Sequence, residues 1–187
     1  MLTVDEEITL RILTKENAAD LFNIVEKNRD FLREWLPWVD SKKTVEDIQT
    51  SIERWGYKYR SNTAINAGIF FRGELVGMVA FPEIDWKAMK TSFGYWLSPD
   101  FEGKGIVVRC IKELTSYAFR KLNLNRLEIS CAEENVKSRA LPEKLGYLKE
   151  GILRDHYYLN GNLHNLIVYS IIKSDWEKVT ENKRVRC

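Results

Sequence analysis

Trp-Leu-Ser-Pro-Asp-Phe-Glu-Gly-Lys-Gly-Ile-Val-Val, residues 96–108, joins a predicted strand to a predicted helix through a short glycine loop. Gly103 and Gly105 let a ligand approach the backbone without a Cβ in the way. Backbone amides at the start of the following helix are free to donate, and the helix end carries a partial positive charge. The pattern indicates an anion site, most often for a phosphate or pyrophosphate, although the same glycines also suit an ordinary turn.

The segments on either side of this loop are clearly periodic. Residues 90–97 alternate as a strand, and 106–122 carry apolar residues at helical spacing. A second strand pattern at 125–132 completes a strand–helix–strand unit, whose two strands are expected to pair in parallel. Further strands are expected at 8–13, 64–71, 74–81, 147–153 and 165–172, and further helices at 15–28, 31–36, 44–59 and 135–145.

Turn signals place antiparallel hairpins before and after this crossover. Arg72-Gly73 joins the first pair of strands, and Asn160-Gly161 precedes the last strand. We therefore expect an α+β (mixed α/β) fold. Its central sheet is twisted and mostly antiparallel, with one parallel βαβ crossover and helices on both faces.

The chain is expected to form a single domain over residues 1–187. No linker composition or internal repeat divides it, and the core is expected at 8–176. From Ser174 onward the sequence is polar and charged, which predicts a frayed tail over 177–187.

Composition narrows the classes of function. The net charge of +2 argues against a broad nucleic-acid surface, which needs clustered basic side chains. The acidic N-terminus lacks the apolar region of a signal peptide, and no apolar run is long enough to span a membrane, so a cytoplasmic protein is expected. Cys110, Cys131 and Cys187 lack metal-ligand spacing, and no metal is expected. The first two lie in apolar segments and are expected to be buried, reduced thiols.

The order of these elements, with the glycine loop where a strand ends, resembles the GNAT acyltransferase fold. The phosphate loop of that family reads Gln/Arg-x-x-Gly-x-Gly/Ala, and residues 102–107 read Glu-Gly-Lys-Gly-Ile-Val. Gly105 matches the central glycine, whereas Glu102 and Val107 depart from the pattern. The resemblance then implies that backbone amides carry the binding of a pyrophosphate, and that the Glu102 side chain points away from it.

A second motif is more specific. Residues 135–147 resemble the Asn-x-x-Ser-x-x-x-x-Glu-Lys-Leu-Gly-Phe signature of the RimJ/RimL branch of the family. The Glu-Gly-Ile-Leu-Arg at 150–154, the Asn-Gly at 160–161 and the Trp-Leu-Pro-Trp at 35–38 are also typical of that branch. The resemblance extends from 8 to 176, nearly the whole chain.

The resemblance implies a GNAT enzyme that uses acetyl-CoA, releases CoA and needs no metal. In the family, the strand before the loop hydrogen-bonds the pantetheine arm, and a backbone amide, here near Leu97, polarises the thioester carbonyl. Asn135 is implied to contact a pantetheine amide, and it also suits a helix N-cap. The cofactor-binding residues implied are Leu97, Ser98, Gly103, Lys104, Gly105, Ile106, Val107, Asn135 and Ser138.

Catalytic residues are less well marked. The resemblance implies that Ser138 donates to the leaving thiolate, although a Ser in the first turn of a helix is often structural. Some RimL-type enzymes are proposed to use a Glu before the last hairpin, and ungapped counting places Tyr157 there. A Tyr is a poor base at neutral pH, so it would position the amine or donate to the thiolate. His156 is adjacent, but strand neighbours face opposite ways. The other candidates for the group that removes the amine proton are Glu83, acting through water, and a water chain alone.

Two classes of function follow. The first is acetyl transfer to a protein N-terminal α-amine, such as that of a ribosomal protein, by direct attack in a ternary complex. A small amine, either a polyamine or an antibiotic, is the alternative acceptor. The second class is a non-catalytic member that binds acyl-CoA or a partner protein. A nucleotide-binding protein is disfavoured, because the loop lacks the further glycine and Ser/Thr of a P-loop.

The expected partners are acetyl-CoA and the acceptor, with neither nucleic acid nor a membrane, and a homo-oligomer is left open. Trp35, Trp38 and Trp86 are candidates for the wall of the acceptor site. Core packing or a subunit contact is the alternative for each of them.

Overall fold

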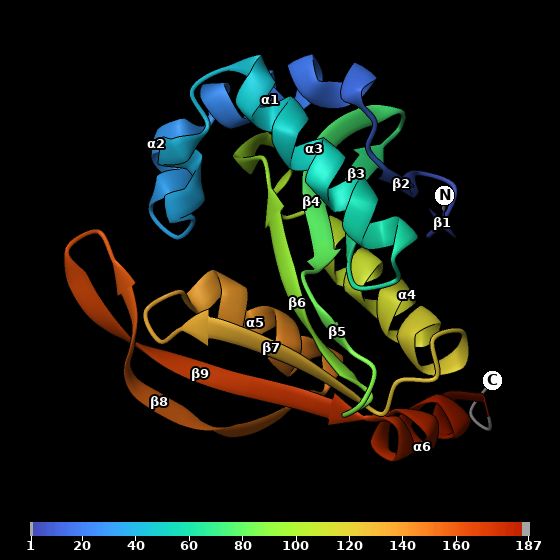
Figure 1. The fold of residues 1–187 in the computed structure, drawn as a ribbon. Helices are drawn as coiled ribbons and strands as arrows, with labels where there is room; N and C mark the ends of the chain where they lie inside the picture. The colour runs from blue at the N-terminus through green and yellow to red at the C-terminus, as the bar shows by residue number, and fades with distance from the viewer. Residues whose placement is uncertain (1, 185–187) are drawn as a thin grey trace.

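The computed structural model describes residues 2–184, and its strands form one mixed sheet in the order β1-β2-β3-β4-β6-β7-β9-β8 (Figure 1). A further short strand, β5, pairs with β6. The described strands are β1 (Leu2–Thr3), β2 (Ile8–Ile12), β3 (Ile65–Phe71), β4 (Glu74–Phe81), β5 (Ile84–Asp85), β6 (Lys90–Leu97), β7 (Arg126–Ala132), β8 (Leu148–Leu159) and β9 (Asn162–Ile172). Every described pair is antiparallel except β6 with β7, which confirms the expected α+β fold with one parallel crossover.

The parallel strands β6 and β7 pair over only part of their length. Lys90–Phe93 pairs with Arg126–Ile129. Beyond that point Gly94–Leu97 continues along β4, and Ser130–Ala132 continues along β9. Figure 1 shows the two halves of the sheet separating from here. We call this separation between the ends of β6 and β7 the strand divergence. It lies at the carboxyl ends of the parallel strands, where ligands usually bind in such sheets.

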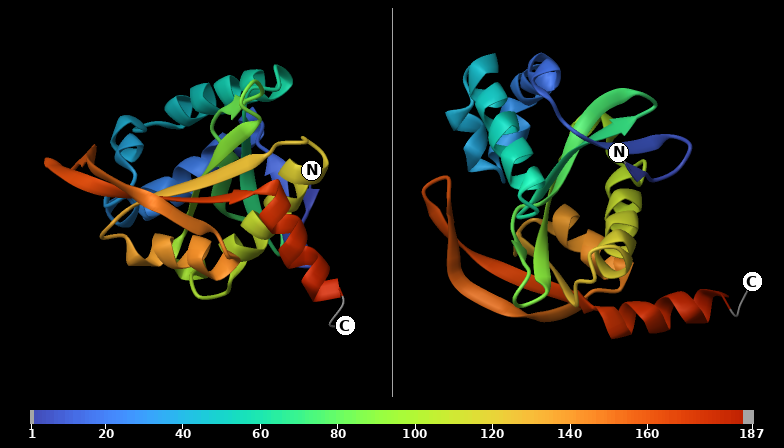
Figure 2. Two further views of the ribbon diagram at one scale, coloured as in Figure 1. Left: turned by 90° about the horizontal axis from the view of Figure 1, so that it is seen from below. Right: turned by 45° about the vertical axis from the view of Figure 1, so that its right-hand side comes forward.

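Helices cover both faces of the first half of the sheet, as Figure 2 shows. Ile69 of β3 packs in one core with Ile111, whereas the next residue, Phe70, packs in a second core with Leu21 and Ile48. Alternate residues of one strand thus face two helical layers. The helices are α1 (Ala18–Lys27), α2 (Arg29–Arg33), α3 (Val45–Arg60), α4 (Ile106–Arg120), α5 (Val136–Leu145) and α6 (Lys173–Arg184), with short 3₁₀ helices at Lys15–Asn17, Pro37–Ser41 and Pro99–Phe101.

β8 and β9 form a hairpin longer than the strands expected on either side of its turn. A bulge at residues 154–156 interrupts β8, because Leu153 pairs with Leu166 while Tyr157 pairs with His164. Such a bulge breaks the alternation of side chains along the strand and re-aims those beyond it.

The helix α6 runs to Arg184, through most of the segment expected as a frayed tail over 177–187, and the fraying itself stays a prediction. Trp176 in its first turn packs against Phe119 of α4, with 5.4 Å between the ring centroids. This aromatic contact anchors a helix whose polar composition gave no sign of packing. Residues 185–187 lie outside the described part of the chain.

Cys110 and Cys131 are free thiols buried in the core, as expected. Burial raises the pKa of Cys110 to about 12, so its thiol is unreactive at neutral pH. Between residues 2 and 184 no helix is both long and apolar enough to cross a membrane. That same part of the chain holds no group of three or more His, Cys, Asp or Glu side chains placed to bind a metal ion.

Candidate active site

The glycine loop presents a row of unpaired backbone amides. Gly103 and Gly105 have φ values of 75° and 67°, and a Cβ at either position would project into open space. Among the described residues nothing accepts a hydrogen bond from the amides of 103–108, and the first amide of α4 with a backbone partner is that of Arg109. A left-handed glycine loop with free amides at a helix start fits an anionic group such as the pyrophosphate of CoA.

The end of β6 turns the amide of Leu97 toward the strand divergence. The Ser98 amide donates to the carbonyl of Val76 at 2.8 Å, so the neighbouring Leu97 amide in this antiparallel pair points away from β4. This direction suits an amide that polarises a carbonyl lying between the two strands. Gly77 allows the close approach of β4 and β6, because a Cβ there would lie 2.9 Å from the Cα of Leu97.

Ser98 uses its backbone groups within the protein, and the cofactor contact expected of it stays a prediction. Its amide is used by Val76, and its carbonyl accepts from Phe101 at 3.0 Å. Its hydroxyl accepts from the side-chain amide of Asn28 at 3.3 Å, and the residue is 3% exposed. Ser98 therefore fixes the turn between β6 and the glycine loop.

The start of α5 brings Asn135 and Ser138 to the other side of the divergence. The Oδ1 atom of Asn135 accepts from the Ser138 amide at 3.0 Å, which confirms its role as the helix N-cap. Its Nδ2 atom has no hydrogen-bond acceptor among the described residues, so it is free to donate to a ligand. Both residues are partly exposed.

Tyr95 reaches from β6 across the divergence to Ser138. The two hydroxyl oxygens lie 3.0 Å apart, and the Tyr95 hydroxyl also lies 3.2 Å from the Ser138 carbonyl oxygen. Burial raises the pKa of Tyr95 well above its usual range, so the phenol keeps its proton. The sequence did not single out this side chain. Its strand position was the available signal, but no local spacing relates it to a residue 43 positions away.

Glu102 occupies the family's Gln/Arg position and forms an ion pair with Lys137 of α5, at 2.6 Å. The Lys137 ammonium also lies 5.7 Å from the ring centroid of Phe31 in α2. The Glu102 charge is thus offset by a cation from the opposite side of the divergence. Lys104 rests its ammonium group 4.6 Å over the ring of Phe101.

The tip of the β8–β9 hairpin lies against the segment that follows α2. Asn160 donates from its side-chain amide to the carbonyls of Arg33 at 3.4 Å and Glu34 at 3.3 Å. The Tyr157 hydroxyl donates to the carbonyl of Trp35 at 3.4 Å. Burial raises the pKa of Tyr157, so this phenol stays protonated at neutral pH and cannot accept a proton there.

His164 is the register partner of Tyr157 and belongs to the same surface. Its ring meets the ring of Trp35 edge to face, with centroids 6.4 Å apart. Its Nδ1 atom lies 3.3 Å from Oε2 of Glu134, in the link between β7 and α5. The sequence did not reveal this group, because its members come from three distant segments and meet only when the hairpin folds back.

The remaining candidates for the acceptor site and for the base do not form one cluster. Trp38 packs against Trp96 of β6, with ring centroids 6.3 Å apart. Trp86 follows β5, which pairs with the first residues of β6, and its indole donates to the Asn62 carbonyl at 2.6 Å. Glu83 directly precedes β5. Trp86 and Glu83 thus lie beside the start of β6, at the end opposite the glycine loop.

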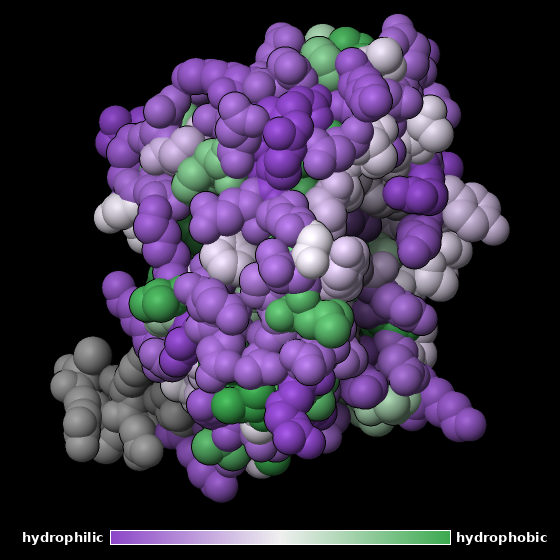
Figure 3. All heavy atoms as spheres, turned by 90° about the vertical axis from the view of Figure 1, so that its left-hand side faces the viewer, coloured by the Kyte–Doolittle hydropathy of each residue, from purple (hydrophilic) through white to green (hydrophobic). Residues whose placement is uncertain are grey.

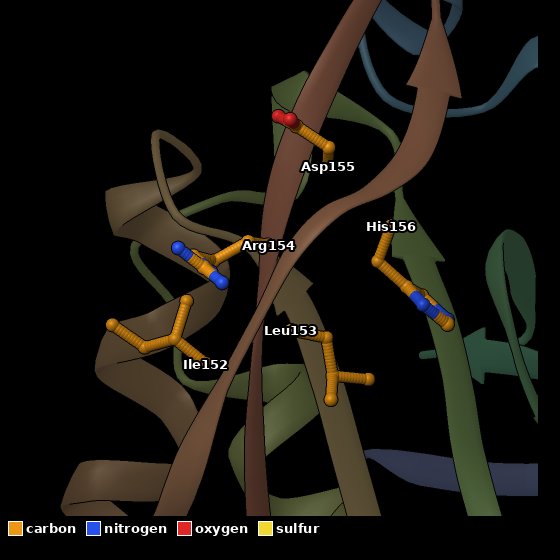
Figure 4. A pocket seen from close by; sticks show the side chains of 5 residues that line it. All are labelled: Ile152, Leu153, Arg154, Asp155 and His156. Atoms are coloured by element: carbon orange, nitrogen blue, oxygen red, sulfur yellow. The ribbon is translucent and has the colours of Figure 1, made fainter.

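The bulge of β8 forms an open hollow lined by residues 152–156 (Figure 4). Arg154 projects to one side of the strand, while Leu153 and His156 project to the other (Figure 4). Leu153 and His156 thus share one side, because the bulge breaks the alternation between them. The expectation that His156 faces away from the side of Tyr157 stays a prediction. The His156 side chain is exposed. Figure 3 shows this side of the molecule as mostly hydrophilic, with separate hydrophobic groups.

This chain is similar in sequence and fold to known proteins. The family model described as "Acetyltransferase (GNAT) domain" matches residues 7–148. The Bacillus subtilis (strain 168) protein named "Putative ribosomal N-acetyltransferase YdaF" is 38% identical over 93% of this chain and 96% of its own length. The Escherichia coli (strain K12) protein named "Spermidine N(1)-acetyltransferase" is 33% identical over 56% of this chain and 56% of its own length.

The solved structure of RimL, described as a ribosomal L7/L12 alpha-N-protein acetyltransferase in complex with coenzyme A, is similar throughout. Its TM-score is 0.88 at 25% identity, covering 91% of this chain and 96% of RimL. The free amides of the glycine loop and the capped start of α5 fit the CoA that such enzymes bind. The chain therefore belongs to the GNAT acetyltransferase family and is an acetyl-CoA-dependent N-acetyltransferase.

Proposed function

We propose that this enzyme acetylates the N-terminal α-amine of a protein, such as a ribosomal protein, by direct attack in a ternary complex. The observation that carries this proposal is the degree of similarity to YdaF, which is 38% identical over 93% of this chain. The Vibrio cholerae protein named "Spermidine N(1)-acetyltransferase" also matches over 92% of this chain, but at 25% identity. The protein named for a ribosomal substrate is thus the more similar of these two relatives over the full length of the fold.

The cofactor roles proposed here follow from the free groups at the divergence. The amides of Gly103–Val107 and the start of α4 would hold the CoA pyrophosphate. The Leu97 amide would polarise the thioester carbonyl, and the Nδ2 atom of Asn135 would donate to a pantetheine carbonyl. Acetyl-CoA supplies the activated acetyl group and a thiolate leaving group.

Two hydroxyls are proposed to serve the leaving group. Ser138 and Tyr95 share a hydrogen bond at the divergence, and the raised pKa of Tyr95 keeps a proton available for donation. Together they would stabilise the departing thiolate by a donated hydrogen bond and return a proton to it. Tyr157 would position the incoming amine beside Trp35, since its phenol and the Trp35 carbonyl are polar groups on the proposed wall of the acceptor site.

A first experiment separates an enzyme from a binding protein. Thermal unfolding is followed with acetyl-CoA, CoA, ATP and NAD, because a ligand that binds only the native state raises its stability. We expect a rise with both CoA compounds and none with ATP or NAD. Thiol release is then measured with an acceptor present. Stabilisation by CoA without thiol release for any acceptor would indicate the non-catalytic alternative.

A second experiment identifies the acceptor. Peptides with the N-terminal sequences of ribosomal proteins are compared with spermidine at matched concentrations, and the acetyl group is placed by mass spectrometry. We expect acetylation at the α-amine of a peptide, and none when that amine is blocked. Faster acetylation of spermidine than of every peptide would contradict the proposal and favour the small-amine alternative.

A further inference from the structure

His164 stands where three elements meet. On β9 it is paired in register with Tyr157 of β8, and its ring lies against Trp35 from the segment after α2. From the link between β7 and α5, Glu134 approaches its Nδ1 atom at 3.3 Å. The His164 side chain is 20% exposed, so the ring is held on several sides but can still be reached.

The contact with Glu134 decides which ring nitrogen is free. An ionised carboxylate can only accept hydrogen bonds, so Nδ1 of His164 carries the hydrogen and donates it to Glu134. The Nε2 atom then keeps its lone pair and can take up a proton. A hydrogen bond from its own backbone amide, and a further one from His164, lower the pKa of Glu134 and keep it ionised at neutral pH.

The same link holds this pair close to the start of α5. Glu133, the neighbour of Glu134, receives a hydrogen bond from the Asn165 side chain at 2.8 Å, and its amide donates to the Asn165 carbonyl at 2.9 Å. Glu134 directly precedes Asn135, the N-cap of α5. His164 is therefore tied on two sides to the segment that carries the proposed cofactor contacts.

We propose that His164, oriented by Glu134, is the general base that takes a proton from the acceptor amine. This inference rests on the proposed function, but it holds for any amine acceptor. It adds a base to a reaction for which the sequence identified none. Tyr157, the neighbouring candidate, keeps its own proton and positions the amine.

The proton balance of the step is simple. The acceptor enters as an ammonium group and gives one proton to Nε2 of His164, directly or through one water. The neutral amine forms a C–N bond with the acetyl carbonyl carbon, and the C–S bond to CoA breaks. The second amine proton passes to the sulfur by way of the Ser138 hydroxyl, and His164 returns its proton to solvent.

The chain offers a matched control, because His156 and His164 are its two histidines. His164→Gln, His156→Gln and Glu134→Gln are compared at saturating acetyl-CoA, with kcat/KM for the acceptor measured from about pH 5.5 to 9.5. The charged or titratable groups that face His164 are Glu134 and Tyr157, and the phenol of Tyr157 stays protonated over most of this range. The lower limb of the profile therefore reports His164 and the amine itself.

We expect His164→Gln to lower kcat/KM at pH 7 by roughly 100-fold or more and to leave a lower limb that is set by the acceptor amine alone. Acetyl-CoA binding, measured by thermal shift, should not change. His156→Gln should keep the wild-type profile. Glu134→Gln should move the lower limb to lower pH, because the imidazolium loses a neighbouring negative charge. Added imidazole should restore part of the activity of a His164→Gly variant.

Activity of His164→Gln within about threefold of wild type, with the lower limb intact, would overturn the inference, as would an equal loss in His156→Gln. The assay uses whichever acceptor, peptide or spermidine, the wild-type enzyme acetylates. Failure of the protein-substrate proposal then appears in the wild-type enzyme, and failure of the His164 proposal appears only in the variants. If the wild-type enzyme acetylates neither acceptor, both proposals fail.

Discussion

The hydroxyl groups of Tyr95 and Ser138 lie 3.0 Å apart and bridge the place where β6 and β7 separate. One belongs to the strand before the glycine loop, and the other to the first turn of α5. The bridge joins the two sides of the divergence with groups that can both give and accept a proton. Removing either group therefore tests the proposed leaving-group chemistry.

We expect Ser138→Ala to lower kcat by about 10- to 100-fold while leaving acetyl-CoA binding nearly unchanged, because the lost donor acts on the departing thiolate. Tyr95→Phe should have a similar effect, and the double variant should lose little more than either single one, since the two hydroxyls act as a unit. Steady-state kinetics and a binding titration measure both quantities. Weaker binding with an unchanged kcat would make Ser138 a cofactor contact instead.

The glycine loop is tested by Gly105→Asp, which should weaken acetyl-CoA binding through bulk and negative charge. Gly105→Ala and Gly73→Ala serve as controls, because they distinguish a loss of acetyl-CoA binding from an effect of backbone strain. Both glycines have positive φ with open space where a Cβ would lie, so each variant should lose about 1–2 kcal/mol of stability. Only the Gly105 variants should lose acetyl-CoA affinity. Unchanged affinity in Gly105→Asp would mean that the loop does not hold the pyrophosphate.

Gly77 is needed for the approach of β4 to β6. A Cβ at Gly77 would overlap the carbonyl oxygen of Trp96, so Gly77→Ala should cost about 1–3 kcal/mol or more and displace Leu97. Gly94→Ala is the control, because a Cβ there meets only Pro82, at 3.8 Å. Chemical denaturation measures both variants. Equal stability losses would show that the strand spacing adjusts to a methyl group.

The stability of the sheet should fall in acid partly through Glu150. Hydrogen bonds from Ser170 and Arg126, with the charge of Arg126, lower the pKa of Glu150 below its ordinary value of 4.5. A lowered folded-state pKa gives stability that is present above about pH 4.5 and is lost as the pH falls through the folded-state value.

Glu150→Gln should therefore lower the Tm at pH 7, and the difference from wild type should shrink below about pH 4. Glu46→Gln, at an exposed position on α3, is the control. The Tm of each protein is followed by circular dichroism from neutral to acidic pH. A difference that stays constant over the whole range would show that the carboxylate charge of Glu150 does not contribute.

Local patterns are enough to predict most elements of this fold. The strand at 90–97 and the start of the helix at Ile106 are placed as expected, because period-2 and period-3.6 apolar patterns depend only on neighbouring residues. The helix at 173–184 was not predicted, because the contact of Trp176 with Phe119 joins residues that are distant in sequence. The hydrogen bonds of Ser98 to Asn28 and Val76 could not be predicted, because both partners are distant in sequence.

The glycine loop and the Asn135 cap can be read from the sequence, because each depends on the conformation of a few consecutive residues. The parallel crossover can be read from the order strand, helix, strand. Which distant side chains meet depends instead on how the elements pack. Tyr95 finds Ser138 because β6 and β7 separate at a particular residue pair. His164 finds Glu134 because the long hairpin carries β9 back beside the link to α5, and no spacing along the chain encodes that approach.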